Sequence, residues 1–554
     1  MNRRILPLSL ILIGTAGCHQ PGHQMAEPAP GPAQLFANMG SHHRTIRTQS
    51  SQAQQYFDQG LTWTFGFNHD EAIRCFHEVT RLDPTCAMGW WGVALANGPH
   101  INNPVMSEAQ SHAAWAAVEK ARALRSHADP TEQTLIDALI HRYAATPPKD
   151  RAPLDKAYSD AMRTVWKAHP QDADIGALFA ESMMDLNPWK LYTREGNPQP
   201  GTAEIVAVLE AVQRIDPDHP GGNHYYIHAV EASRTPQRAM GAADRLRNAV
   251  PTSGHLTHMP SHIDVRTGRW AEASDANVRA SAADRSYRER SPRQGFQKVY
   301  MAHNLHFLTY AAMMEGRSEI AIETARRMVH EVPPEKAREQ AAFLDPVMGI
   351  SNETLMRFGR WDEILKSPPP PSFLPITTAL WHFSRGVSYA ATNRLPEAAS
   401  SQTAFRSTVK RIPKDAIFGN NTAHDVLSVA EHMLAGEIAF RRGSIDEAIT
   451  ELREAVRLED RLGYDEPPDW IQPVRHTLGA VLLSAGRISD AEQVYRDDLA
   501  RLPGNGWSLY GLSKCLTARG ATDDARVVDE RFKKAWARAD MTIGSSCLCV
   551  KHGS

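Results

Sequence analysis

Small residues, an apolar or aromatic residue and a proline recur at one fixed spacing in stretches that lie far apart in this 554-residue chain. One stretch reads QGLTWTFGFNHDEAIRCFHEVTRLDP and another reads LGAVLLSAGRISDAEQVYRDDLARLP. The matching positions are Gly60 and Gly479, Trp63 and Leu482, Ala72 and Ala491, Phe76 and Tyr495, and Pro84 and Pro503, with Gly436, Gly443, Ala448, Leu452 and Ala455 in the same frame. This spacing predicts pairs of antiparallel helices, because small residues let two helices cross closely and a proline ends the second helix.

The turn between the two predicted helices has its own signature, G-[RS]-x-x-[ED]-A. It recurs at Gly268–Ala273, Gly316–Ala321, Gly359–Ile364 and Asn393–Ala398, and more weakly at Arg234–Ala239. Ala239 and Ala273 are 34 residues apart, as are Ile364 and Ala398. This period and the placement of small residues resemble the tetratricopeptide repeat. The resemblance implies an all-α fold, a right-handed superhelical solenoid of antiparallel helix pairs.

A second resemblance is narrower. The phrases FNHDEAIRCFHEVTRLDPTCAMGWWGVALANGP and HMPSHI look like those of a bacterial group of tetratricopeptide lipoproteins. That resemblance implies a fold and no particular activity.

The N-terminus has the pattern of an export signal. Arg3 and Arg4 precede the apolar run Ile5–Ile13, which is too short to span a bilayer, and small residues then lead to Cys18. The pattern resembles a bacterial lipoprotein signal and predicts cleavage before Cys18 and a lipid on its sulfur; a plain secretory signal is the alternative. The lipid would anchor the protein in the cell envelope, on the periplasmic face of the outer membrane if the source is Gram-negative.

The chain is predicted to consist of six segments. They are a signal peptide (1–17), a Pro/Gly-rich tether (18–50), an N-terminal helical region (51–200), central His-rich repeats (201–333), a C-terminal repeat array (334–540) and a cysteine-containing tail (541–554). The formal net charge is −2 and the charged residues are spread along the chain, which argues against a nucleic-acid partner. Five cysteines remain after Cys18, so internal disulfides cannot pair all of them.

Histidines recur on one face of three consecutive predicted first helices, the helices that line the concave groove of a tetratricopeptide array. Residues of one helix face lie three, four or seven positions apart. That face carries His224, His228 and Glu231, then His255, His258, His262 and Arg266, and then His303, His306 and Tyr310. Neighbouring helices pack about 8–10 Å apart, so these imidazoles are predicted to share one cavity. Pro260 leaves two alternatives: the helix begins near Met259, with His255 and His258 on a loop, or it kinks there.

Clustered imidazoles beside a glutamate predict a transition-metal site, with copper, iron or zinc as the ion. The predicted ligands are His224, His228, Glu231, His255, His258, His262, His303 and His306. Arg266 is predicted to bind an anion or carboxylate, Tyr310 to donate a hydrogen bond, and His476 to occupy a groove position further along. A polar groove without metal and a chance clustering are the alternatives. His100, His112, His127, His141 and His169 share no register and are expected to take no part.

The tail SSCLCVKHGS contains Cys547, Cys549 and His552. Two sulfurs and one imidazole predict a second metal site for Cu(I) or zinc, and the alternatives are a disulfide between the two cysteines or two unused thiols.

Two functions follow from these patterns. The first is a lipid-anchored solenoid whose histidine-rich groove binds a transition metal and binds or oxidises a small substrate. The second is an adaptor whose groove binds a peptide or partner protein without catalysis, as tetratricopeptide arrays commonly do. The chain has no H-E-x-x-H, no G-x-S-x-G and no phosphate-binding glycine loop, which disfavours the usual zinc peptidases, serine hydrolases and nucleotide-binding enzymes.

Overall fold

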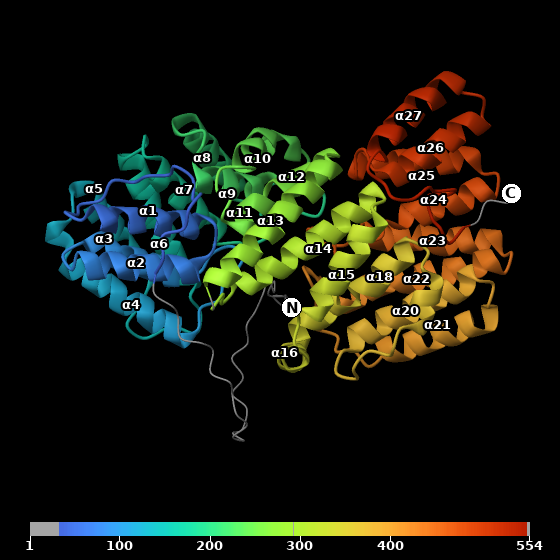
Figure 1. Cartoon of the computed structure of the whole chain (residues 1–554), viewed down its shortest axis with the longest axis horizontal. Coiled ribbons are helices and arrows are strands. Elements are labelled where there is room, and N and C mark those ends of the chain that lie inside the picture. The colour runs from blue at the N-terminus through green and yellow to red at the C-terminus, as the bar shows by residue number, and fades with distance from the viewer. Residues whose placement is uncertain (1–32, 292, 551–554) are drawn as a thin grey trace. The chain divides into compact units, whose positions relative to one another are not determined.

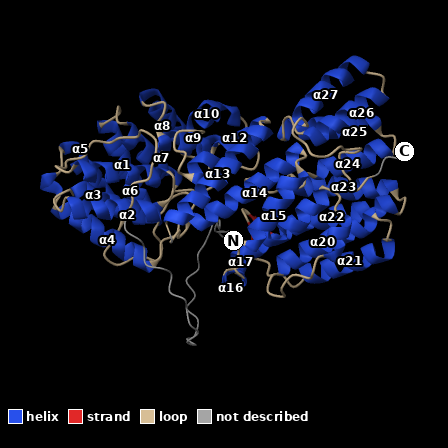
Figure 2. Ribbon diagram, viewed as in Figure 1, coloured by secondary structure: helices blue, strands red, loops and turns tan. Residues whose placement is uncertain are grey.

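Helices make up nearly all of the regular structure in the computed structural model, which describes residues 33–291 and 293–550 (Figures 1 and 2). The one sheet within these residues is a short hairpin of β1 (Ile417–Phe418) and β2 (Asn421–Thr422). Helices that follow one another in the chain pack together as pairs, for example α1 with α2 and α22 with α23. The predicted all-α fold of tetratricopeptide-like helix pairs is confirmed.

The described residues divide into two compact units, each with its own apolar core. The first unit contains the residues up to Ile263 together with Ala276–Asn304, and the second contains Asp264–Asp275 and the residues from Leu305 onward. The division passes through three helices, α12 (Pro260–Thr267), α13 (Trp270–Arg290) and α14 (Gln297–Glu315). Repeat similarity predicted boundaries near residues 200 and 333, and neither coincides with this division.

The remaining helices belong to one unit each. Those of the first unit are α1 (Ser51–Phe65), α2 (His69–Leu82), α3 (Ala87–Asn97), α4 (Glu108–Ala123), α5 (Pro130–Leu139), α6 (Ala152–Ala168), α7 (Ala173–Met184), α8 (Thr202–Ile215), α9 (Pro220–Val230), α10 (Met240–Leu246) and α11 (Gly254–His258). Those of the second unit are α15 (Ser318–His330), α16 (Pro334–Glu339), α17 (Ala341–Leu344), α18 (Ile350–Arg357), α19 (Trp361–Lys366), α20 (Pro375–Ala391), α21 (Leu395–Val409), α22 (Ala423–Arg441), α23 (Ile445–Glu459), α24 (Val474–Ser484), α25 (Ile488–Arg501), α26 (Gly506–Ala518) and α27 (Thr522–Ala535). Short 3₁₀ turns lie at η1 (Arg125–His127), η2 (Ile140–Arg142), η3 (Pro236–Ala239) and η4 (Asp345–Gly349).

The recurring turn signature marks one local structure. The residue at its first position has a positive φ in each well-conserved case, namely 57° at Phe67, 80° at Gly268, 72° at Gly316, 63° at Gly359, 62° at Asn393, 86° at Gly443 and 74° at Gly486. The next N–H then closes the end of the first helix, as from Arg487 to the Leu482 carbonyl at 2.9 Å. At Arg234–Ala239, where the signature is weak, the chain forms η3 instead.

Small residues lie where the helices of a pair cross, as the spacing predicted. A Cβ atom added to Gly60 would lie 2.8 Å from Phe76, and one added to Gly479 would lie 2.5 Å from Tyr495. These two contacts occupy the same positions of two repeats, so a side chain larger than hydrogen would force the helices apart.

Residues 33–50, which fall in the predicted tether, pack against the first unit. Phe36 and Ile46 are buried, and the Phe36 N–H donates to Gln59 Oε1 at 2.7 Å. Arg44 pairs with Asp172 and Asp174 at 2.9 Å each. This part of the predicted tether therefore belongs to the folded body, whereas the predicted signal and Cys18 lie outside the described residues.

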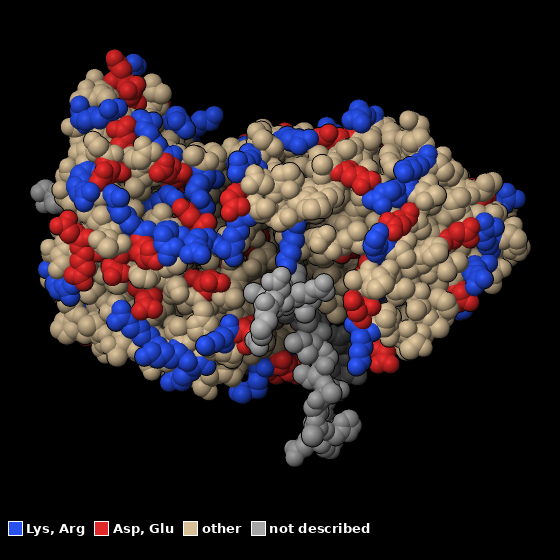
Figure 3. All heavy atoms as spheres, turned by 180° about the vertical axis from the view of Figure 1, so that it is seen from behind, with Lys and Arg blue, Asp and Glu red and all other residues tan. Residues whose placement is uncertain are grey.

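The surface shows charges of both signs side by side. Lys and Arg alternate with Asp and Glu over the face seen in Figure 3, and no large basic patch appears on that face. Within residues 33–291 and 293–550, no helix is long and apolar enough to cross a membrane.

Candidate metal centre

Four helices of the first unit carry the predicted histidines. His219 caps α9 by accepting the Gly222 N–H at 2.9 Å, and Pro220 opens that helix with its fixed φ. Ser253 caps α11 in the same way. Met259, between α11 and α12, keeps helical dihedrals (φ −50°, ψ −37°), so the backbone kinks at Pro260 without unwinding. His255 and His258 therefore lie on a helix, the second of the two alternatives left by the sequence.

Six of the predicted histidines form two groups of three. Site A contains His224, His228 and His255, and site B contains His258, His262 and His303; in each site one ligand atom per residue lies within 4.8 Å of the others. The two sites are adjacent, since the ring centroids of His228 in site A and His262 in site B are 5.6 Å apart. We call these residues the six-histidine cluster.

Five of the six cluster histidines are buried and His303 is partly exposed. His224, His255, His258 and His262 are each at most 1% exposed and His228 is 6% exposed. Phe67 packs on His224 at a centroid distance of 4.6 Å and Tyr300 packs on His255 at 4.2 Å. The sequence predicted that these imidazoles face the groove and share one cavity; in the structure the rings lie together and aromatic side chains pack on them.

The Nδ1 atom of four cluster histidines faces an oxygen acceptor. His224 Nδ1 lies 2.6 Å from the Phe65 carbonyl oxygen and His258 Nδ1 lies 2.7 Å from Asn277 Oδ1. His228 Nδ1 and His262 Nδ1 lie 2.8 and 2.5 Å from the two oxygens of Glu231. A carbonyl or carboxylate oxygen can only accept, so these four rings carry their proton on Nδ1 and a lone pair on Nε2.

The Nε2 atoms of neighbouring rings face one another. His258 Nε2 and His262 Nε2 are 2.8 Å apart, and His224 Nε2 and His255 Nε2 are 3.2 Å apart. His228 Nε2 is buried and has no hydrogen-bond partner. His255 Nδ1 has no hydrogen-bond partner, so the His255 Nε2–H can donate to His224 Nε2. His258 and His262 both donate from Nδ1, so their two Nε2 lone pairs repel unless a proton or a cation lies between them. Two nitrogens bound at about 2.0 Å to one tetrahedral ion would be roughly 3.3 Å apart, so the His224–His255 pair already has this separation and the His258–His262 pair would open by about 0.5 Å.

Glu231 contacts one histidine of each site. Each of its oxygens accepts one Nδ1–H, so the carboxylate connects site A with site B and holds two rings in the same tautomer. Burial alone would raise the pKa of Glu231, but the two imidazoles beside it lower that pKa to about 2. Glu231, His228 and His262 also form a group whose ligand atoms lie within 4.8 Å of one another, so the prediction of Glu231 as a metal ligand stays a prediction beside this orienting contact.

Burial also favours the neutral form of four of these imidazoles. It lowers the pKa of His224, His255 and His258 well below the usual value of histidine, and the neighbouring imidazoles lower it further. The pKa of His262 is lowered less, because Glu231 partly offsets the effect of burial. A neutral imidazole is the form that binds a metal ion.

His306, Arg266, Tyr310 and His476 belong to the second unit and not to the cluster. His306 lies in no group of potential ligands among the described residues. Arg266 lies over the Tyr464 ring at 5.2 Å, and the Tyr310 hydroxyl is buried without a hydrogen-bond partner. The register along consecutive helices placed His306 with the cluster, but α14 passes from one unit into the other between Asn304 and Leu305.

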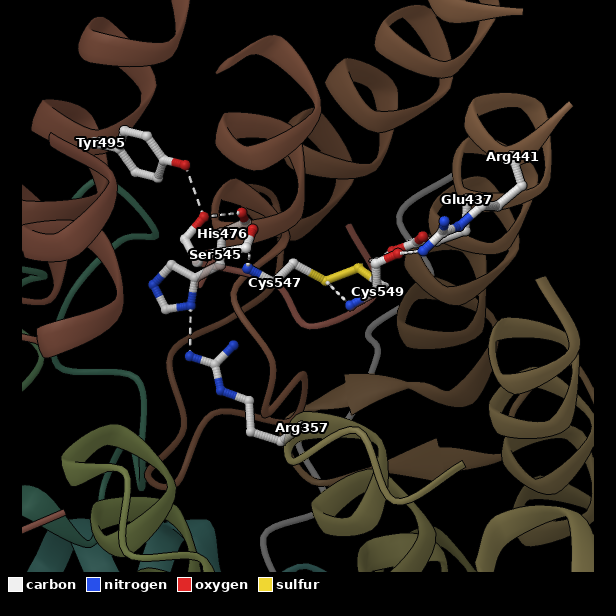
Figure 4. Close-up of a disulfide and its surroundings, with 9 residues drawn as sticks. Arg357, Glu437, Arg441, His476, Tyr495, Ser545, Cys547 and Cys549 are labelled. Carbon is white, nitrogen blue, oxygen red and sulfur yellow. Dashed lines mark hydrogen bonds between the residues drawn. A yellow bond between two sulfur atoms is a disulfide. The ribbon is translucent and has the colours of Figure 1, made fainter. Parts of the chain in front are cut away.

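His476 has its own partners in the second unit. Arg357 donates to His476 Nδ1 at 2.8 Å (Figure 4). The Nε2–H of His476 therefore donates to Asp498 at 3.0 Å. With one nitrogen accepting and the other donating, His476 has no lone pair left for a metal ion or a ligand.

The tail contains a disulfide between Cys547 and Cys549 (Figure 4). This is one of the three alternatives that the sequence left open. His552, the third residue of the predicted second site, lies outside the described residues.

Other histidines near the cluster were missed. His100 was expected to take no part, yet it is 3% exposed, stacks on Phe67 at 4.3 Å and has an Nδ1 without a hydrogen-bond partner. His69 packs against it at 4.5 Å. The loop after α3 carries His100, so helical register could not reveal its position.

A third group in the first unit has a different character. His42, Asp174 and His219 lie together, with both imidazoles 3.0 Å from Asp174 Oδ1 and Arg44 2.9 Å from Oδ2. His219 Nδ1 accepts the Gly222 N–H, so its Nε2 carries a proton. The group is a hydrogen-bonded network that ties residues 42–44 to α7 and α9.

The chain was compared with known proteins. Its sequence matches no protein-family model and no curated protein. Among solved structures, the human IFIT1 dimer with m7Gppp-AAAA is similar over 88% of this chain and 91% of its own, with 12% identity and a TM-score of 0.30. The APC/C hetero-tetramer Cut9-Hcn1 is similar over 87% of this chain and 76% of its own, also with 12% identity and a TM-score of 0.30. Likenesses this low carry no argument about a ligand.

Proposed function

We propose that the protein is a metalloprotein that holds two transition-metal ions in the six-histidine cluster, one in site A and one in site B. The observation that carries this proposal is the contact between His258 Nε2 and His262 Nε2 at 2.8 Å, because both rings already donate from Nδ1. A cation between these nitrogens turns a repulsive contact into two bonds. The carbonyl and carboxylate oxygens behind the rings are the partners that metal-bound histidines usually have.

The ligand set indicates the class of chemistry. Three histidines per ion leave a coordination position open, as in catalytic rather than structural sites. Imidazole suits copper, iron and zinc, and of these copper and iron exchange electrons readily. We propose an oxidoreductase acting on a small molecule as the activity of the loaded centre; the adaptor function is the alternative.

The predicted export signal gives the proposed location. Arg3, Arg4, the apolar run Ile5–Ile13 and Cys18 support a lipid-anchored protein of the cell envelope, and imidazole-bound copper or iron suits a location outside the cytoplasm.

Metal analysis of protein purified without a histidine tag tests the proposal. After reconstitution with copper, iron or zinc, the wild type should retain two ions per chain. His258→Ala/His262→Ala should lose the ion of site B and keep that of site A, and His224→Ala/His228→Ala should do the reverse. His112→Ala removes an exposed histidine and should change nothing. If the wild type retains none of the three metals, or if the cluster variants do not alter its metal content, the metalloprotein proposal is contradicted and the adaptor function is favoured.

A further inference from the structure

Residues 545–550 of the C-terminal tail lie within the second unit, next to a buried carboxylate. Cys549 and Val550 are each 1% exposed, whereas Cys547 is partly exposed. Arg441 donates to the carbonyl oxygen of Cys549 and the Ser546 hydroxyl bonds the carbonyl oxygen of His476 at 2.7 Å, so the tail is held from two sides (Figure 4).

Glu437 of α22 faces the disulfide. It is 0% exposed, its Oε1 lies 3.8 Å from Cys547 Sγ, and its Oε2 is buried without a hydrogen-bond partner. Burial raises the pKa of Glu437 to about 7, although Arg441 opposes this. A buried carboxyl with an unused oxygen costs free energy unless a donor or a cation reaches it.

The two sulfurs and an oxygen of Glu437 lie within 4.8 Å of one another. While the disulfide is intact the sulfurs cannot act as thiolate ligands. Once it is broken, they can move to roughly 3.8 Å apart, the separation of two thiolates on a tetrahedral ion with Zn–S bonds of about 2.3 Å. Two thiolates and one carboxylate are ligands that zinc accepts.

We propose that the reduced tail is a separate zinc(II) site, with Cys547, Cys549 and Glu437 as its ligands, and that the disulfide closes this site. The site lies within the second unit and does not depend on the six-histidine cluster. Two sulfur ligands give it a preference for soft cations that the cluster lacks.

A dithiol or a phosphine can supply the two electrons that reduce the Cys547–Cys549 disulfide. A phosphine takes the oxygen of one water molecule and becomes its oxide, while the sulfur–sulfur bond takes up two electrons and two protons and gives two thiols. The partly exposed Cys547 sulfur gives the reductant its point of attack. Zinc(II) then displaces both thiol protons, and the Glu437 carboxylate is the third ligand.

Cobalt(II) is the probe, because thiolate ligands give it a near-ultraviolet charge-transfer band that histidines and carboxylates do not give. Full-length protein reduced with a phosphine should develop this band with one equivalent of cobalt(II), and zinc(II) should abolish it. Oxidised protein should show no band. Glu437→Gln should weaken cobalt(II) binding at least about tenfold, since an amide is a much poorer ligand than a carboxylate.

The controls separate this site from the cluster. Cys547→Ser/Cys549→Ser should lack the band and Cys515→Ser, which changes another buried cysteine, should keep it. His258→Ala/His262→Ala should also keep the band even if the cluster binds no metal at all. Circular dichroism verifies that each variant is folded. No band in reduced wild type, a band in oxidised wild type or in the double serine variant, or unchanged affinity in folded Glu437→Gln would each overturn the proposal.

Discussion

At the scale of single residues, the proton position on each imidazole decides what the cluster can do. The sequence placed His224, His228, His255, His258 and His262 on shared helix faces, because the spacing of a helix is regular. It could not show that Nδ1 of four of these rings, all but His255, meets an oxygen, since for example Phe65 and Asn277 come from other helices. The orienting role of the oxygens behind these rings therefore appeared only with the structure.

Glu231→Gln tests this orienting role. The amide keeps the volume of the carboxylate but has one acceptor oxygen, and its NH₂ group faces one of two N–H donors. One ring then loses its acceptor, and its proton can move to Nε2, where it blocks the ligand atom. We expect metal affinity to fall about 10–100-fold, measured by competition with a chelator, while the helical circular dichroism stays unchanged.

Glu210→Gln is the matched control for that substitution. Glu210 accepts from the Tyr226 hydroxyl at 2.8 Å and is partly exposed, so its loss should leave metal affinity as it is. If Glu231→Gln binds metal as tightly as the wild type, Glu231 does not set the tautomers.

At the scale of helices and turns, the local sequence predicts the backbone conformation, because the interactions that fix a turn are made by residues close together in the chain. Gly486 has φ 74°, and a Cβ added there would meet nothing within 4 Å. Gly486→Ala should therefore destabilise the protein by about 1 kcal/mol through backbone strain alone. Urea unfolding measures this loss of stability. Gly544→Ala is the control, because space is also open at Gly544 and its φ is not positive, and this variant should be about as stable as the wild type. Equal effects at both positions would show that the turn conformation is not the cause.

Residue spacing correctly predicted which side chains share a helix face. It did not predict contacts between parts of the chain that lie far apart in sequence. The repeat spacing correctly predicted the helix pairs and the close crossing at Gly60 and Gly479, which depend on neighbours a few tens of residues away. Phe67, which packs on His224, is distant from it in sequence, and Tyr300 of α14 packs on His255 of α11, so register along a single helix did not show how these rings are buried. His100 was missed for the same reason.

At the scale of the whole molecule, the division into two units separates features that the sequence had joined. The predicted ligand residues Arg266, Tyr310 and His476 belong to the second unit, where His476 already has partners on both nitrogens. A periodic sequence gives no sign of where one core ends, because both cores are built from the same kind of helix pair. Each unit therefore has its own candidate metal site, histidine-based in the first and sulfur-based in the second.

Metal bound in the first unit should consequently protect that unit. A ligand that binds only the folded state at about 1,000 times its Kd adds about 4 kcal/mol to stability. Hydrogen exchange followed by mass spectrometry should therefore slow in α9 and α11 when copper, iron or zinc is added to oxidised protein, and should stay unchanged in α22–α27. His258→Ala/His262→Ala should lose the part of the protection that comes from site B. Equal slowing in both sets of helices would mean that the two units open together and that the ion stabilises the chain as a whole, whereas slowing confined to α22–α27 would place the metal in the second unit and contradict the cluster as its site.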